Sequence, residues 1–120
     1  MKNKVAFLVV SCDHYSDLWH PFFKTFHKYW SDCPYQLYLA SNFKQYEDTK
    51  VKNIPYGEDQ PFSTNLINIL KNIEEDNIIL WFEDAFITKK VNNEFVSNLI
   101  NKAISLNIDH LKLTVDYPLY

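Results

Sequence analysis

Glycine is almost absent from this chain, since Gly57 is the only glycine among 120 residues. The G-x-G-x-x-G turn of dinucleotide-binding proteins and the P-loop both need several glycines, because their backbone passes close to phosphate groups. Neither loop can form from this sequence. The composition therefore argues against typical NAD-dependent enzymes and against P-loop kinases and GTPases.

Arginine is missing altogether, and all 12 basic residues are lysines, in a chain of net charge −3. Surfaces that bind nucleic acid usually carry a basic face on which arginine contacts phosphate in a bidentate way. We therefore expect no nucleic-acid partner. If the chain binds a phosphate group, the negative charge must be neutralised by lysine, by backbone N–H groups or by a metal ion.

Long apolar runs are also missing, and no run approaches the roughly 20 residues that a membrane-spanning helix needs. The apolar run after the basic start is too short for a signal peptide and has no cleavage site behind it, so we expect a cytoplasmic chain without a transmembrane segment. The two cysteines, Cys12 and Cys33, do not have the spacing of a zinc site. A helix between them would separate them by roughly 20 Å, whereas bridged cysteines need Cα atoms within about 7 Å.

Apolar runs and helical stripes alternate along the chain. The run VAFLVV at 5–10 is typical of a strand that is buried on both faces. Aromatic residues then recur at three- and four-residue spacing between Trp19 and Trp30, which predicts an amphipathic helix. We expect strands at 5–10, 35–41, 51–55, 77–82 and 110–114, and helices at 18–30, 63–76 and 92–107. The order predicts an α/β domain over 1–120, with a mostly parallel sheet and helices on both faces.

Three helix starts carry residues that often cap helices. We predict that Ser16 or Asp17 caps the first helix, that Ser63 caps the second, and that Asn92 or Asn93 caps the third.

Carboxylates gather in the segments that follow the predicted strands. Ligands of open α/β sheets bind outside the carboxyl ends of the strands, and these ends are followed here by 11–17, 40–42, 55–63 and 83–86. Three of these four segments contain acidic residues. Without arginine, such an edge suggests Mg²⁺ or Mn²⁺ bridging to phosphate oxygens. We interpret Glu58 and Asp59 as turn residues rather than as ligands.

Glu83 and Asp84 interrupt the apolar stretch NIILWFEDAFI directly after a predicted strand. In a functional interpretation, one carboxylate binds the metal and the other orients it or contacts sugar hydroxyls. Neighbouring residues on a regular strand point to opposite faces, so both can serve one site only if the strand has ended there. In the alternative interpretation, the pair is a solvated end of the strand.

The segment after the first strand holds a second group of candidates. Ser11 and Asp13 could accept hydrogen bonds from a ribose or a base, and Tyr15 could stack on a base. In the alternative, this is an ordinary loop in which Asp13 forms an Asx-turn. His14 is the one histidine at this edge and is kept as a further candidate.

Two short motifs carry a family resemblance. The stretches SCDHYSDLW and LWFEDAF, with the strand YQLYLAS between them, resemble the N-terminal half of bacterial and viral glycosyltransferase-like proteins of polysaccharide gene clusters. The resemblance implies a three-layer, Rossmann-like fold of the GT-A type. It also implies that 1–120 is the nucleotide-sugar-binding domain, or the N-terminal part of a longer enzyme that continues with an acceptor-binding half.

Site residues follow from this resemblance position by position. Ser11, Cys12 and Asp13 would line the nucleotide pocket. Glu83 and Asp84 would take the place of the acidic metal-binding motif, which is usually Asp-x-Asp, whereas here the two acids are adjacent. Their role would be to hold Mg²⁺ or Mn²⁺ against the diphosphate of the donor. No residue is assigned as the catalytic base.

The sequence thus predicts a glycosyltransferase-type domain that binds a nucleotide sugar, UDP-linked by expectation, and transfers the sugar to a glycan or another hydroxyl acceptor. The alternative is a non-catalytic α/β module that binds a ligand or a partner, including a second copy of itself. A phosphoacceptor-type signalling domain ranks third, because no well-placed lysine follows a later strand.

Overall fold

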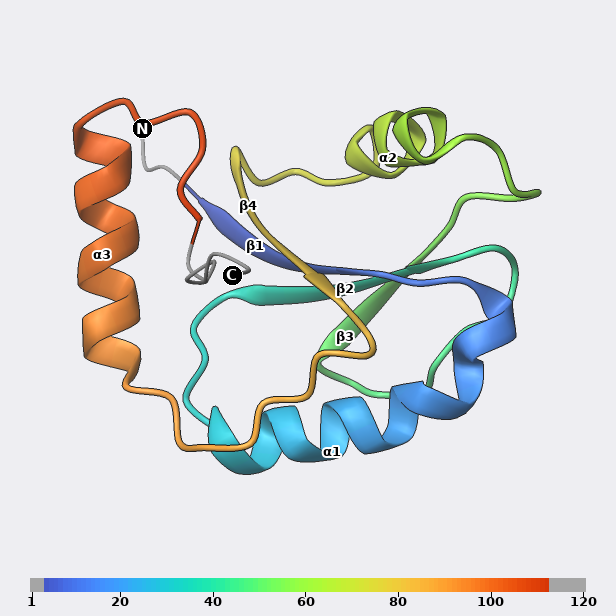
Figure 1. Cartoon of the computed structure of the whole chain (residues 1–120), viewed down its shortest axis with the longest axis horizontal. Coiled ribbons are helices and arrows are strands. Elements are labelled where there is room, and N and C mark those ends of the chain that lie inside the picture. The colour runs from blue at the N-terminus through green and yellow to red at the C-terminus, as the bar shows by residue number, and fades with distance from the viewer. Residues whose placement is uncertain (1–3, 113–120) are drawn as a thin grey trace, which may run out of the picture.

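Four parallel strands form one sheet in the order β3-β2-β1-β4 (Figure 1). The computed structural model describes residues 4–112. Its strands are β1 Val5–Val10, β2 Gln36–Ser41, β3 Val51–Pro55 and β4 Asn77–Phe82; its helices are the 3₁₀ helix η1 Asp13–Leu18, α1 Trp19–Tyr29, α2 Phe62–Leu70 and α3 Asn93–Ser105. The predicted α/β class is confirmed, and every strand pair in this sheet is parallel.

Strand β1 lies inside the sheet and is covered on both faces. Its alternate side chains point to opposite sides, so that Phe7 and Val9 join a cluster with α1 while Ala6 and Leu8 join a cluster with α2. Figure 1 shows α1 and α2 on opposite sides of the sheet. This two-sided burial is why the segment is apolar at every position.

Helix α1 supplies an aromatic core to its face of the sheet. Phe22, Phe23, Phe26 and Trp30 are buried, and the ring centroids of Phe7 and Phe26 are 5.0 Å apart in an edge-to-face arrangement. Helix α3 joins this core at the end where α1 finishes, because the indole N–H of Trp30 donates to Oδ1 of Asn93 over 3.1 Å. The predicted helical stripe is therefore the core of this face.

Helix ends agree less well with the predictions. Ser16 and Asp17 do not cap α1, because η1 runs directly into it and the N–H of Trp19 donates to the Ser16 carbonyl. Ser63 does not cap α2, which begins one residue earlier, behind Pro61. Only the cap of α3 is confirmed, with Asn92 Oδ1 accepting from the N–H of Phe95 over 3.0 Å.

Helix α2 is also shorter than predicted, since it ends at Leu70 instead of continuing to 76. The residues beyond it include Glu74, Glu75 and Asp76. Negative charges are unfavourable near the C-terminus of a helix because of its dipole, and this cost explains the early end. Of the strand predicted at 110–114, residues 110–112 are not in a strand, and 113–114 lie outside the described residues. In the described range 4–112, no helix has the length and apolar character to cross a membrane.

The two cysteines lie at opposite ends of the sheet. Cys12 follows β1, whereas Cys33 precedes β2, and both are free thiols. Burial raises the pKa of Cys33 to about 11. Cys33 packs against the aromatic core, and its burial disfavours the thiolate, which is the reactive form of cysteine.

Helix α2 is held to the sheet mainly by Ile69, whose side chain is fully buried. We expect Ile69→Ala to lower the free energy of unfolding by about 2–5 kcal/mol, because it removes buried methyl groups and leaves a cavity. Ile67→Ala is the matched control, since Ile67 is 56% exposed on the same helix, and should change stability by less than about 0.5 kcal/mol. Urea unfolding followed by circular dichroism measures both, and equal losses would contradict this arrangement.

A second prediction concerns Asp48, whose Oδ2 lies 2.6 Å from Nε2 of His27 on α1. Burial of Asp48 raises its pKa, but the hydrogen bonds from His27 and from the N–H of Lys50 outweigh burial, so the pKa is lower than in the unfolded chain. A lowered pKa in the folded state stabilises the fold above the unfolded value of about 4, and the contribution is lost as pH falls through the folded pKa.

We therefore expect Asp48→Asn to reduce the free energy of unfolding at neutral pH and to flatten its fall between about pH 5 and pH 3. Urea unfolding at a series of pH values gives both quantities. Glu47→Gln, which changes the neighbouring exposed carboxylate, should leave the acid-induced loss of stability as in the unmodified chain. Parallel pH curves for Asp48→Asn and the unmodified chain would show that Asp48 does not contribute.

Candidate functional site

The candidate site lies where β1 and β4 end side by side. Along the sheet, β2 and β3 lie on one side of β1 and β4 lies on the other, so the strand order reverses between β1 and β4. Ligands of open α/β sheets bind outside the carboxyl ends of the strands at such a reversal. Val10 pairs with Phe82 in the register of these strands, and so the next residues, Ser11 and Glu83, come together at this position.

Ser11 joins four parts of the fold at this point. Its hydroxyl donates to Oε1 of Glu83 over 2.9 Å and accepts from the indole N–H of Trp19, on α1, over 2.8 Å. Its backbone N–H donates to the carbonyl of Ala40 on β2, and its carbonyl accepts from the hydroxyl of Tyr56 over 2.7 Å. Ser11 is buried. It therefore acts as a structural centre of the edge.

Asp13 orders the segment that follows β2. Its carboxylate accepts from the backbone N–H groups of Phe43 and Lys44 at 3.0–3.1 Å. Its own N–H donates to Oδ1 of Asn42 over 2.9 Å. The carboxylate is thus engaged by backbone of another strand end, rather than by an Asx-turn within its own loop.

Asn42 continues this network to the segment after β3. Its side-chain Nδ2 donates to the carbonyl of Gly57 over 2.9 Å, and the N–H of Gly57 donates back to the Asn42 carbonyl over 3.0 Å. Gly57 has a φ of +90°, a backbone conformation that is sterically unfavourable for residues with a side chain. The single glycine of the chain therefore sits where the backbone requires it, and the ends of β1, β2 and β3 are connected.

Carboxylates of several loops lie near Tyr56 at this edge. Burial raises the pKa of Tyr56 to about 12, and the charges of Asp59, Cys12, Asp13 and Glu83 act in the same direction. These groups come from the segments after β1, β3 and β4. A phosphate ligand would be repelled here unless a cation accompanied it.

Glu83 and Asp84 differ in their surroundings. Glu83 is only 7% exposed, and it is held by Ser11. Asp84 is exposed, and no hydrogen bond from within residues 4–112 reaches its carboxylate. The strand has ended, as the prediction required, because the N–H of Ala85 turns back to the carbonyl of Phe82. The solvated-cap interpretation thus fits Asp84 and does not fit Glu83.

The described part of the chain contains no group of three or more His, Cys, Asp or Glu side chains arranged to hold a metal ion. Mg²⁺, however, is commonly bound by one or two carboxylates with the remaining positions taken by water and substrate phosphates. Asp84, beside Glu83, fits that type of donor set. The assignment of these two residues to a metal stays a prediction.

The other candidates lie around this centre with different exposure. Cys12 is half-buried, and Tyr15 is 50% exposed with its ring against that of His14. In the loop before α2, Glu58 is exposed, and Asp59 accepts from Nδ2 of Asn65 over 3.3 Å. These contacts agree with Asp59 as a turn residue. Tyr15 has a free aromatic surface, but nothing in these contacts tests its role in binding a base.

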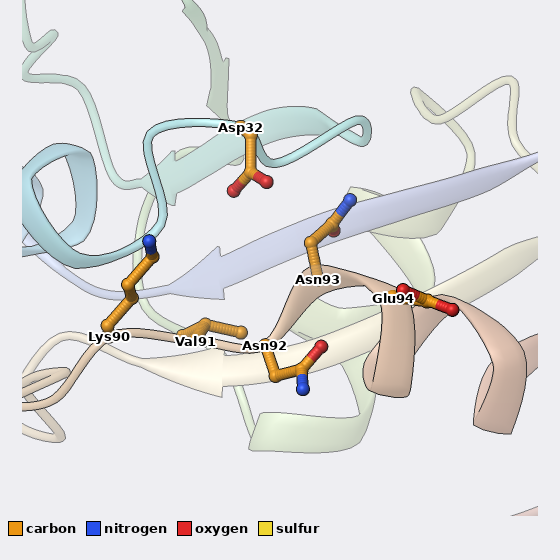
Figure 2. A pocket seen from close by; sticks show the side chains of 6 residues that line it. All are labelled: Asp32, Lys90, Val91, Asn92, Asn93 and Glu94. Atoms are coloured by element: carbon orange, nitrogen blue, oxygen red, sulfur yellow. The ribbon is translucent and has the colours of Figure 1, made fainter.

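A separate cavity lies at the start of α3. It has a volume of about 530 Å³ and is lined by Asp32, Lys90, Val91, Asn92, Asn93 and Glu94. Figure 2 shows these side chains coming from the turn before β2, from the segment that leads into α3 and from the first residues of α3. We give more weight to the carboxyl edge, because the cavity lies near the amino end of β2 and its two asparagines are engaged in a helix cap and in the bond to Trp30.

Sequence reasoning missed three members of the site. Trp19 was interpreted as core only, although its N–H also supports Ser11. Asn42 and Tyr56 were not selected, although both follow predicted strands. A polar residue directly after each parallel strand is the signal that would have identified Asn42 and Tyr56.

No protein-family profile, curated protein or solved structure matches this chain.

The Ser11 hydroxyl gives a direct test of this geometry. Ser11→Ala leaves the buried Glu83 carboxylate and the Trp19 N–H without their partner, so we expect a loss of about 1–3 kcal/mol in the free energy of unfolding. Ser16→Ala is the control, because the hydroxyl of Ser16 only accepts a 3.3 Å bond from Lys44 at the surface. Urea unfolding measures both variants, and a Ser11→Ala chain as stable as Ser16→Ala would contradict a supporting role.

Proposed function

We propose that this chain is a glycosyltransferase-type domain of GT-A-like, three-layer architecture. It binds a nucleoside diphosphate sugar, UDP-linked by the resemblance, at the carboxyl edge of the sheet together with Mg²⁺ or Mn²⁺. The sugar is transferred to a glycan or another hydroxyl acceptor. The observation that supports this most is the Ser11–Glu83 hydrogen bond, which bridges the reversal of strand order with the exposed Asp84 next to it.

The donor would enter between the loops that the network of Asp13 and Asn42 holds in place. Tyr15, which is half-exposed beside this network, offers an aromatic face for a base. Ser11 and Asp13 are largely occupied by protein contacts, so their contribution is to hold these loops in position. Preorganised loops lower the entropic cost of binding a ligand.

Asp84, with Glu83 beside it, would hold the divalent cation. When bound, such an ion neutralises the diphosphate and makes the nucleoside diphosphate a better leaving group. The chain's own acidic residues at this edge exclude an unaccompanied diphosphate by repulsion, and so they make binding depend on the cation. No residue within 4–112 is assigned as the base that deprotonates the acceptor.

The competing function is a non-catalytic α/β module. The exposed apolar side chains of β4, Leu80 at 43% and Phe82 at 42%, favour an interaction surface on this chain. Such a surface does not exclude donor binding at the carboxyl edge, because Leu80 and Phe82 are not among the residues proposed to bind the donor. Metal-dependent binding of UDP separates the two functions.

Calorimetric titration of UDP into the chain tests the proposal. We expect micromolar binding with Mn²⁺ and none with EDTA, and we expect Asp84→Asn to weaken it at least about tenfold, equivalent to about 1.4 kcal/mol. Glu58→Gln removes the same charge from an exposed residue of a neighbouring loop and should change the affinity less than about threefold.

Two results would overturn this function. One is the absence of any heat of binding in a folded chain saturated with Mn²⁺. The other is equal weakening by Asp84→Asn and Glu58→Gln, which would mean that only the net charge of the edge matters.

A further inference from the structure

The outer edge of β4 presents backbone groups on the side away from β1. The N–H of Asn77 donates to the carbonyl of Lys4, so it faces β1. Because backbone groups of a strand alternate in direction, Ile78, Leu80 and Phe82 turn their N–H groups away from β1. Within residues 4–112, no strand pairs with this side of β4. The edge can therefore accept one more strand.

Nothing in the sequence of β4 protects this edge. Natural edge strands usually carry lysine, proline, a bulge or an inward-pointing charge that prevents pairing with other chains. The six residues NIILWF of β4 contain none of these. The strand is apolar on both faces, which is the pattern of a strand whose two faces are covered, yet Leu80 and Phe82 are exposed.

Exposed apolar side chains lie next to this backbone edge. Leu80 and Phe82 are 43% and 42% exposed, and the ring of Phe82 lies 6.3 Å from the ring of Phe62, which is itself 52% exposed at the start of α2. An added strand would lay alternate side chains over this group. Its own apolar residues must therefore recur at every second position.

The charges around β4 indicate the chemistry of the partner. The eleven residues 74–84 contain five carboxylates and no lysine. Glu74 and Asp76 are exposed before the strand, and Asp84 is exposed after it. The nearest lysines along the chain are Lys71 and Lys89. Lys4 directly precedes β1, the strand that pairs with the opposite edge of β4.

A second copy of the chain fits this edge less well than a basic segment. Two identical strands related by a two-fold axis must pair antiparallel. Pairing centred on Leu80 would bring Asp76 of one copy opposite Asp84 of the other, and like charges directly opposite each other destabilise a strand pair. An incoming strand with basic ends meets acid at both ends of β4 instead, whichever direction it runs.

We propose that the outer edge of β4 binds an extended polypeptide segment of another protein by strand addition. The segment has apolar residues at alternating positions and lysine or arginine at both ends. Its backbone pairs with Ile78, with Leu80 and with the N–H of Phe82, whose carbonyl already accepts from Ala85. Its apolar side chains cover Leu80, Phe82 and Phe62, and its basic ends face Glu74, Asp76 and Asp84. This inference does not depend on nucleotide binding.

Fluorescence anisotropy with two labelled peptides, KKVTVTVKK and EEVTVTVEE, provides the test. We expect the basic peptide to bind the full chain without UDP or Mn²⁺, and the acidic peptide to bind at least about tenfold more weakly. Leu80→Pro removes one outward N–H and is tolerated on an edge strand, so it should weaken the basic peptide at least about tenfold. Leu80→Val, which keeps that N–H and a similar apolar side chain, should stay within about threefold of the unmodified chain.

Several results would overturn the inference. These are no binding of the basic peptide, equal binding of both peptides, or equal binding by Leu80→Pro and Leu80→Val. A chain that is dimeric by light scattering and becomes monomeric in Leu80→Pro would identify a second copy as the partner. Unfolding of Leu80→Pro but not of Leu80→Val, seen by circular dichroism, would show that the chain already fills this edge itself.

Discussion

The Ser11 hydroxyl is the interaction on which the carboxyl edge depends, because it is shared between Trp19 and Glu83. A single oxygen accepts from α1 and donates to the segment after β4, while the backbone of the same residue contacts β2 and Tyr56. A buried carboxylate needs hydrogen-bond donors to remain in the fold. Placing Glu83 here fixes where β4 ends, and that fixes the position of Asp84 in solvent.

Patterns of apolar residues predicted most of the fold. Val5–Val10 was predictable because burial on both faces of the sheet requires an apolar residue at every position. The stripe of α1 was predictable because burial of one helix face places apolar residues three or four positions apart. The starts of α1 and α2 were not, because η1 runs directly into α1 and because α2 begins behind Pro61 without a side-chain cap.

The candidate site was predicted in position but not in detail. The rule for parallel sheets located Ser11, Asp13 and the Glu83–Asp84 pair at one edge, and the structure brings these strand ends together. The sequence could not show that two adjacent acids take different roles, one buried and one exposed. That difference depends on Trp19 and Ser11, which are distant from Glu83 along the chain, and no local pattern encodes such a contact.

The connections among Asp13, Asn42 and Gly57 have a thermodynamic consequence for any ligand of this edge. Three segments outside regular strands are held by backbone and side-chain bonds before a ligand arrives. Their conformational entropy is therefore lost when the chain folds and is not lost again on binding. Association at this edge should resemble the docking of two rigid bodies, with an encounter rate set by diffusion and electrostatic repulsion rather than by the ordering of loops.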